Sequence, residues 1–179
     1  SNIEAGAAYG VLMYVNFIFL AIFIGIGVGS SPIVSYHYGA ENHVELKSLR
    51  RKSTVIILSF SVAMFALAQF LALPLSQIFV GYDRDLLAMT CRAFRFCSFM
   101  FLFAGINIYG SAFFTALNNG LVSALISFLR TLVFQVAAVL IFPIFLELDG
   151  VWLSVVAAEI LSVFVTIVFL IGLKGKYHY

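Results

Sequence analysis

The sequence is poor in charge, proline, cysteine and tryptophan. Charged residues make up 10% of its 179 residues, and it holds three prolines, two cysteines and one tryptophan. An average soluble domain is about 25% charged. The formal net charge of +2 is too small for a nucleic-acid-binding surface. Cys91 and Cys97 lie six residues apart in a mostly apolar stretch, so they match no metal-binding spacing, and we expect them to be reduced.

Motifs of soluble enzymes are also missing. The sequence has no Gly-Lys-Ser/Thr phosphate loop, no His-Glu-x-x-His and no Gly-x-Ser-x-Gly. The run GIGVG at residues 25–29 follows no strand and lies inside an apolar stretch, so it does not indicate a dinucleotide site. We therefore expect no enzyme activity, no bound metal and no cofactor.

Apolar residues, in contrast, make up 63% of the chain. A soluble protein of this length would leave large apolar patches exposed, so we expect lipid to cover much of the surface. Five stretches are long enough to cross about 30 Å of hydrocarbon. They cover about residues 5–38, 53–73, 87–117, 121–146 and 151–173. The sequence therefore predicts an all-α, polytopic membrane protein with one domain over residues 1–179.

The predicted connectors carry most of the charge. Residues 41–52 form a polar connector, Pro74 ends the second span, and residues 75–86 form a loop. The sequence Asn118-Asn119-Gly120 predicts a tight turn with glycine supplying a positive φ, and residues 147–150 predict another turn. Lys and Arg favour the cytoplasmic side of a membrane. Residues 41–52 and the tail together hold six Lys and Arg against three on the other side, so we expect the tail and the 41–52 loop in the cytoplasm.

The end of the first span is rich in helix-breaking residues. Glycine and proline are tolerated in a membrane helix because the alternative is unpaired backbone in lipid. We predict that these residues serve close helix packing and bending. They are Gly25, Gly27, Gly29, Pro32 and Gly39.

Several segments together resemble one known family. A glycine-rich helix end is followed by Pro-Ile-Val-Ser-Tyr at 32–36, Tyr-Gly-Ala-Glu-Asn at 38–42 and a basic segment at 47–52. Further matches are residues 111–120, Arg130, the sequence Gly-Val-Trp-Leu-Ser at 150–154, and Ala158-Glu159. Over nearly its whole length the chain resembles the C-terminal half of a multidrug and toxic compound extrusion (MATE) transporter, entered just after that half's first helix.

This resemblance implies a fold and a function. The five helices would form most of one six-helix lobe, and the other lobe of the transporter would be the partner. The protein would export small organic, often cationic compounds across the plasma membrane in exchange for protons or sodium, by alternating access. Two other functions stay open: a lipid-linked saccharide flippase or polysaccharide exporter of related architecture, and a membrane scaffold that transports nothing.

Ionisable groups at membrane depth are the strongest candidates for function. Arg130 lies about ten residues into the fourth span and Glu159 about nine into the fifth, which places both roughly 13 to 15 Å deep. We predict an ion pair or a shared hydrogen-bond network between them. The pair is either a structural contact between adjacent helices or a site where Glu159 exchanges a proton or cation. The alternative is that the Arg130 side chain snorkels to the cytoplasmic face.

Uncharged polar residues in the spans are the next candidates. Asn107, with Tyr109 beside it, lies in the third span, Gln69 in the second and Asn16 in the first. They either line a substrate or ion path or form hydrogen bonds between helices. No Asp or Glu lies between residues 87 and 117, where the resemblance would place an acidic residue for cation coupling in some relatives.

Overall fold

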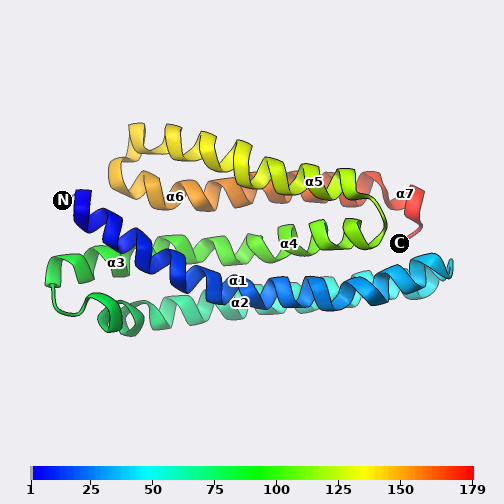
Figure 1. The fold of residues 1–179 in the computed structure, drawn as a ribbon, viewed down its shortest axis with the longest axis horizontal. Coiled ribbons are helices and arrows are strands. Elements are labelled where there is room, and N and C mark those ends of the chain that lie inside the picture. The colour runs from blue at the N-terminus through cyan, green and yellow to red at the C-terminus, as the bar shows by residue number, and fades with distance from the viewer. Residues whose placement is uncertain (1) are drawn as a thin grey trace.

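In the computed structural model, which describes residues 2–179, the chain is a bundle of long helices aligned along one axis (Figure 1). The described residues contain no strand, so the all-α prediction is confirmed. Helices α1 (Asn2–Gly39) and α2 (His43–Val80) have 38 residues each. Each is therefore about 57 Å long, which is more than the hydrocarbon core of a bilayer requires.

Two more helical rods complete the bundle. Helix α3 (Arg84–Cys97), the 3₁₀ turn η1 (Ser98–Met100) and α4 (Phe101–Ala116) run on without a break. Helix α5 (Gly120–Phe128), the π-helical segment η2 (Leu129–Phe134) and α6 (Gln135–Gly172) follow, and the short α7 (Lys174–Tyr177) ends the described chain. Helix α6 reverses direction at Glu147, where φ is 51° and ψ is −128°, so the chain makes five passes.

The helices have the length and composition of membrane spans. Four continuous helical stretches of the described chain are long and apolar enough to cross a bilayer, and the last of them, Gly120–Gly172, contains the reversal at Glu147. Large apolar side chains cover the outside of the bundle; Phe70 is 81% exposed and Phe145 is 79% exposed. The protein is therefore a multi-pass membrane protein.

The two sets of connectors lie at opposite ends of the bundle. The α1–α2 connector, the α4–α5 turn and the C-terminus lie at one end in Figure 1. The N-terminus, the α2–α3 loop and the reversal in α6 lie at the other. This is the grouping from which the sidedness of the chain was predicted.

Helix α2 corrects two predictions about connectors. It begins at His43, because the Asn42 side chain accepts a hydrogen bond from the backbone N–H of Glu45 at 3.2 Å and caps the helix. The basic residues 47–52 are therefore helical. The helix also continues through Pro74 to Val80. Proline removes one backbone hydrogen bond, but a helix supported by neighbouring helices keeps the remainder.

The turn between α4 and α5 uses asparagine where glycine was expected. Asn118 has a φ of 60°, and no glycine of the described residues has a positive φ. Asparagine is one of the few residues that tolerate this conformation, because its short side chain can bond to nearby backbone. The Asn119 side chain then caps α5 by accepting from the backbone N–H of Val122 at 3.2 Å. The predicted turn is present, but Gly120 is not its left-handed residue.

The glycines of α1 face in two directions. A Cβ at Gly27 would lie 3.1 Å from the Cβ of Ala112, so this glycine lets α1 approach α4. A Cβ at Gly25, Gly29 or Gly39 would meet nothing within 4 Å in the described chain. Close packing within this chain therefore involves only one of the four, because residues two apart on a helix point to opposite faces. Helix α1 is continuous through Pro32, and bending there stays a prediction.

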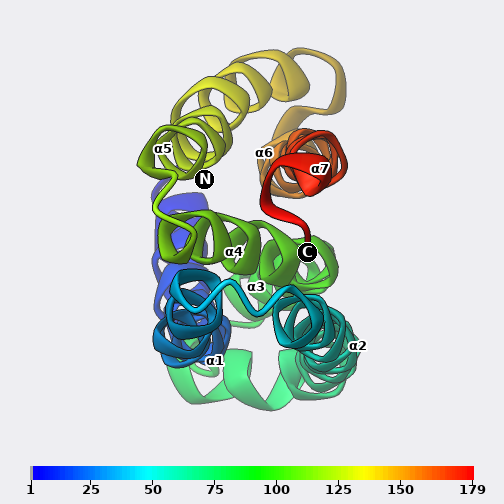
Figure 2. The ribbon, with the colours of Figure 1, turned by 90° about the vertical axis from the view of Figure 1, so that its right-hand side faces the viewer.

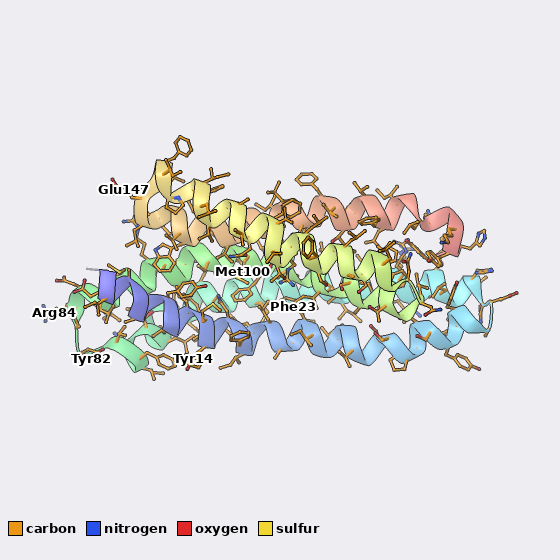
Figure 3. The ribbon with its side chains drawn as sticks, turned by 45° about the horizontal axis from the view of Figure 1, so that its top comes forward. Tyr14, Phe23, Tyr82, Arg84, Met100 and Glu147 are labelled. Carbon is orange, nitrogen blue, oxygen red and sulfur yellow. The ribbon has the colours of Figure 1, made fainter. Side chains whose placement is uncertain are left out.

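Helix α4 is the centre of the bundle. It packs against α1, α2, α5 and α6 and lies between the α1–α2 pair and the α5–α6 pair in the end view (Figure 2). A Cβ at Gly105 would lie 2.8 Å from the Phe23 ring and 2.9 Å from the Ser61 hydroxyl oxygen, so only glycine fits at this crossing. Figure 3 shows Phe23 and Met100 near the middle of the bundle.

Candidate functional site

The site begins with a change of helix type. Residues Leu129–Phe134 form a π-helical segment between α5 and α6, and Arg130 is its second residue. A π-helical turn is wider than an α-helical one, is rare, and occurs frequently at functional sites. No residue of this segment is buried. The segment carries the only charged side chain of this pass and directs it toward the returning part of α6.

Arg130 of η2 and Glu159, in the part of α6 that follows the reversal, form a bidentate ion pair. Arg130 Nε donates to Glu159 Oε1 at 2.8 Å and to Oε2 at 3.0 Å, and Nη2 donates to Oε1 at 2.7 Å. The Glu159 side chain is 5% exposed and the Arg130 side chain is 22% exposed. The predicted contact is thus present, with a carboxylate that is almost fully shielded and a guanidinium that is partly open.

Asn107 on α4 connects this pair to the centre of the bundle. Its Nδ2 donates to Glu159 Oε2 at 2.7 Å and to the Glu159 backbone oxygen at 3.1 Å. Its Oδ1 accepts from the Thr166 hydroxyl at 3.0 Å. All three side chains are buried. The result is one network of four side chains, Arg130, Glu159, Asn107 and Thr166, hereafter the carboxylate network.

A glycine makes this network possible. A Cβ at Gly110 would lie 2.4 Å from the Cγ2 of Thr166. Because Gly110 is one turn beyond Asn107 on α4, the missing side chain lets α6 come close enough for the hydrogen bond between Asn107 and Thr166. Close approach of two backbones through small residues is typical of membrane helix pairs.

A cavity lies beside the carboxylate network. Its volume is about 300 Å³, and it lies between α1, η1, η2 and α6. Its polar groups come from Asn16, Arg130, Thr131, Gln135 and Glu159, and Tyr9, Leu12, Met13 and Phe17 are among its apolar walls. This volume is at the lower end of the range for small-molecule sites. The network is therefore accessible to a small ligand or an ion.

Comparison with known proteins identifies the family. The family model MatE matches residues 4–141, which is more than three quarters of the chain. The chain belongs to the MatE family. No curated protein matched this MatE chain.

Solved structures with the same fold are MATE transporters. The chain matches the outward-facing conformation of a multidrug resistance MATE family transporter of the MOP superfamily with a TM-score of 0.84 at 21% identity, over 92% of this chain and 38% of that one. It matches the Vibrio cholerae MATE transporter VcmN in the bent form with a TM-score of 0.82 at 17% identity, over 89% and 36%. It also matches an inward-facing MATE family transporter with a TM-score of 0.80 at 21% identity, over 89% and 36%. The MatE chain thus spans less than two fifths of each of these proteins.

The structure separates the predicted site residues into four places. Arg130, Glu159 and Asn107 meet in the carboxylate network. Asn16 lies on the wall of the adjoining cavity, where its Nδ2 is 3.7 Å from the Met100 sulfur. Gln69 lies elsewhere in the MatE bundle, as its Nε2 donates to the Arg95 backbone oxygen at 3.0 Å and to the Ser98 hydroxyl at 2.6 Å.

Tyr109 also points away from the carboxylate network. Its ring is buried and lies 5.8 Å from that of Phe113. Two residues along a helix correspond to about 200° of rotation, so Asn107 and Tyr109 face opposite sides of α4. Although they are neighbours in sequence, they belong to different parts of the MatE bundle.

Sequence reasoning missed Thr166 as a member of the carboxylate network. The signal was present, since Glu159, Ser162 and Thr166 follow the i, i+3, i+7 spacing of one helix face, and all three are buried. A buried polar stripe on an apolar helix indicates a facing polar partner.

The carboxylate network contains one carboxylate, that of Glu159. The described residues contain no group of three His, Cys, Asp or Glu side chains that could hold a metal ion. Both Glu159 oxygens accept hydrogen bonds from Arg130, and Oε2 also accepts one from Asn107. A proton or a monovalent cation at Glu159 would compete with the guanidinium for the same oxygens.

Proposed function

We propose that this MatE chain is one lobe of a secondary transporter that exports small organic, often cationic compounds in exchange for protons or sodium. The observation that carries this proposal is the carboxylate network beside the cavity: a shielded Glu159 whose charge is balanced by Arg130. Ionisable groups inside a membrane are costly and are typical of ion pathways. The other lobe and the lipid bilayer are the proposed partners.

The coupling step follows from the geometry of the network. With Glu159 ionised, the Arg130 guanidinium donates three hydrogen bonds to the Glu159 carboxylate. A proton or sodium ion on Glu159 cancels its charge and weakens its attraction for the guanidinium. Arg130 is partly exposed to the cavity, so it can turn toward the cavity without leaving the protein. The network then has two states that differ in the occupancy of one carboxylate.

The lobe would move largely as a unit. The chain superposes on an outward-facing and on an inward-facing transporter with similar scores, 0.84 and 0.80. Such similarity supports rocking of one lobe against the other, as expected for alternating access in transporters built from repeats. We assign the end with the α1–α2 connector and the tail to the cytoplasm, from the excess of Lys and Arg there.

The test is drug efflux from cells that express the full-length gene product carrying this chain. A fluorescent organic cation is the substrate, and the proton and sodium gradients are collapsed separately and then together. Efflux that stops with one gradient identifies the coupling ion. Efflux that is absent, or that persists with both gradients collapsed, contradicts the proposal.

The variant Glu159→Gln then tests the coupling step. We expect efflux, measured per amount of protein in the membrane, that no longer responds to the gradient. Glu45→Gln, at an exposed carboxylate of α2, is the matched control. If Glu159→Gln keeps its ion coupling but lowers the protein yield, the carboxylate network has only a structural role.

A further inference from the structure

A second hollow lies far from the carboxylate network, between α2 and α3. It is an open groove of about 980 Å³ at the end of the bundle that holds the α2–α3 loop. Its walls include Phe65 and Leu73 from α2, and Leu87, Phe96 and Phe99 from α3 and η1. Three arginines, Arg84, Arg92 and Arg95, complete the lining, and no acidic residue takes part in it. We call it the arginine groove.

The arginines form one row along α3. Arg84 and Arg95 are eleven residues apart, which corresponds to three helical turns, and Arg92 is one turn from Arg95. Ala88 and Cys91 fill the same face between them. All three arginine side chains are exposed, and Figure 3 shows Arg84 at the tip of the bundle. The groove thus has one charged rim and otherwise apolar walls.

Two of these arginines have their charge available. Arg92 forms an ion pair with Asp149 of α6, and its guanidinium lies 5.6 Å from the centre of the Phe96 ring. The salt bridges of the described residues include neither Arg84 nor Arg95. The nearby Asp83 side chain is engaged at the start of α3, where it accepts from the backbone N–H groups of Asp85 and Leu86.

The depth of the groove matches the border of the membrane. Residues 96–116 contain no charged side chain and number about twenty, which is the length that crosses the hydrocarbon core. Arg95 therefore lies at the edge of the hydrocarbon, Arg92 about 5 Å further out, and Arg84 about 16 Å further out, beyond the headgroups. Phe65, Phe96 and Phe99 line the part of the groove that faces the acyl chains.

The floor of the groove is held by a polar contact. Gln69 donates to the Arg95 backbone oxygen and to the Ser98 hydroxyl, and both its partners lie at the junction of α3 and η1. This ties α2 to the junction and fixes the spacing of the two walls. Gln69, a predicted residue of the substrate or ion path, thus has a positioning contact in the arginine groove.

From this arrangement we infer that the arginine groove binds an anionic phospholipid of the adjacent leaflet. Its phosphate lies at the unpaired Arg95, and one acyl chain follows the phenylalanines inward. Arginine matches phosphate oxygens in a bidentate fashion. An organic cation, the substrate class proposed for the transporter, would be repelled by the same row. The inference concerns a different site and does not depend on the proposed function.

The experiment is native mass spectrometry of the full-length protein in detergent, titrated with phosphatidylglycerol or phosphatidylcholine. The wild type should retain phosphatidylglycerol in preference to phosphatidylcholine. Arg95→Gln should weaken phosphatidylglycerol binding about fivefold, the effect of one cation at a membrane surface. Arg84→Gln, an exposed arginine of the same row whose charge lies beyond the headgroups, is the matched control and should change phosphatidylglycerol binding little.

A groove-filling variant separates a shaped site from charge alone. Ala88 is exposed within the groove on the headgroup side of Arg95, so Ala88→Trp should fold normally and obstruct the headgroup while keeping all three arginines. We expect it to weaken phosphatidylglycerol binding as well. Equal binding of the two lipids by the wild type, unchanged binding in Ala88→Trp, or a loss in Arg84→Gln equal to that in Arg95→Gln would each overturn the inference.

Discussion

The Arg130–Glu159 ion pair predicts an unusual order of stabilities. Replacing Glu159 by Met leaves a guanidinium roughly 13 to 15 Å inside the membrane without its partner. Replacing Arg130 by Met leaves a carboxylate that is 5% exposed, with Asn107 as its remaining side-chain donor. Removing one partner of a buried pair costs about 3–5 kcal/mol, and a lone charge at the membrane centre about 2.5–3.5 kcal/mol. Each single variant should therefore lose about 3 kcal/mol.

The double variant should lose less than either single one. With both residues replaced by Met no unpaired charge remains, and apolar side chains of similar volume often replace a buried ion pair at little cost. Asn107 keeps its bonds to the Glu159 backbone oxygen and to Thr166, because neither involves the replaced side chains. We expect the double variant to lie within about 2 kcal/mol of the wild type.

The assay is equilibrium unfolding of the purified full-length protein in mixed detergent micelles. Gln135→Met, an uncharged substitution on the wall of the same cavity, is the control and should cost less than about 1 kcal/mol. A double variant less stable than both single variants would refute the reasoning. It would mean that each of the two charges is stabilised by other groups or by water and not by the other charge.

Three further predictions concern packing, hydrogen bonding and pH. Gly110→Ala should destabilise the protein by about 1–3 kcal/mol, because its Cβ would overlap Thr166. In the control Gly29→Ala, whose Cβ would meet nothing within 4 Å, the free energy of unfolding should change by less than about 0.5 kcal/mol. Thermal unfolding measures both. Asn107→Leu removes a hydrogen bond to a charged carboxylate and should cost about 1.5–3 kcal/mol in the micelle unfolding assay. Burial raises the pKa of Tyr179 in the tail from 10.0 to about 12, so its contribution to stability is complete below pH 10 and is lost as the pH rises to about 12. Unfolding measured from pH 9 to 12 should show this loss in the wild type and not in Tyr179→Phe, and equal slopes in the two would contradict it.

The predicted ion pair illustrates what a membrane sequence reveals by itself. Few ionisable residues lie inside the spans, so each one stands out against an apolar background. Arg130 and Glu159 lie at matching depths on successive antiparallel passes, which allowed their contact to be predicted without any knowledge of side-chain direction. The same argument could not join Asn107 to them, because an uncharged amide has many possible partners at that depth.

Helix ends and helix types were less predictable. Pro74 was expected to end a helix by a rule that reflects helices in water, whereas the bundle supports α2 on both sides of it. The segment Leu129–Phe134 is apolar except for Arg130 and Thr131 and carries no signal that distinguishes a π-helix from an α-helix. The arginine groove was also not predicted, because it depends on the spacing between two helices and not on the order of residues in either.

The π-helical segment affects which mutations this protein can tolerate during evolution. A π-helical turn holds about one residue more than an α-helical turn. Because the wider turn absorbs this extra residue, deleting one residue from 131–134 would restore a regular α-helix and leave the rest of the pass in its orientation, but it would remove the π-helical turn from which Arg130 reaches Glu159. The carboxylate network therefore depends on chain length at this point as well as on residue identity, and single-residue deletions here should be far less tolerated than substitutions of the same apolar residues.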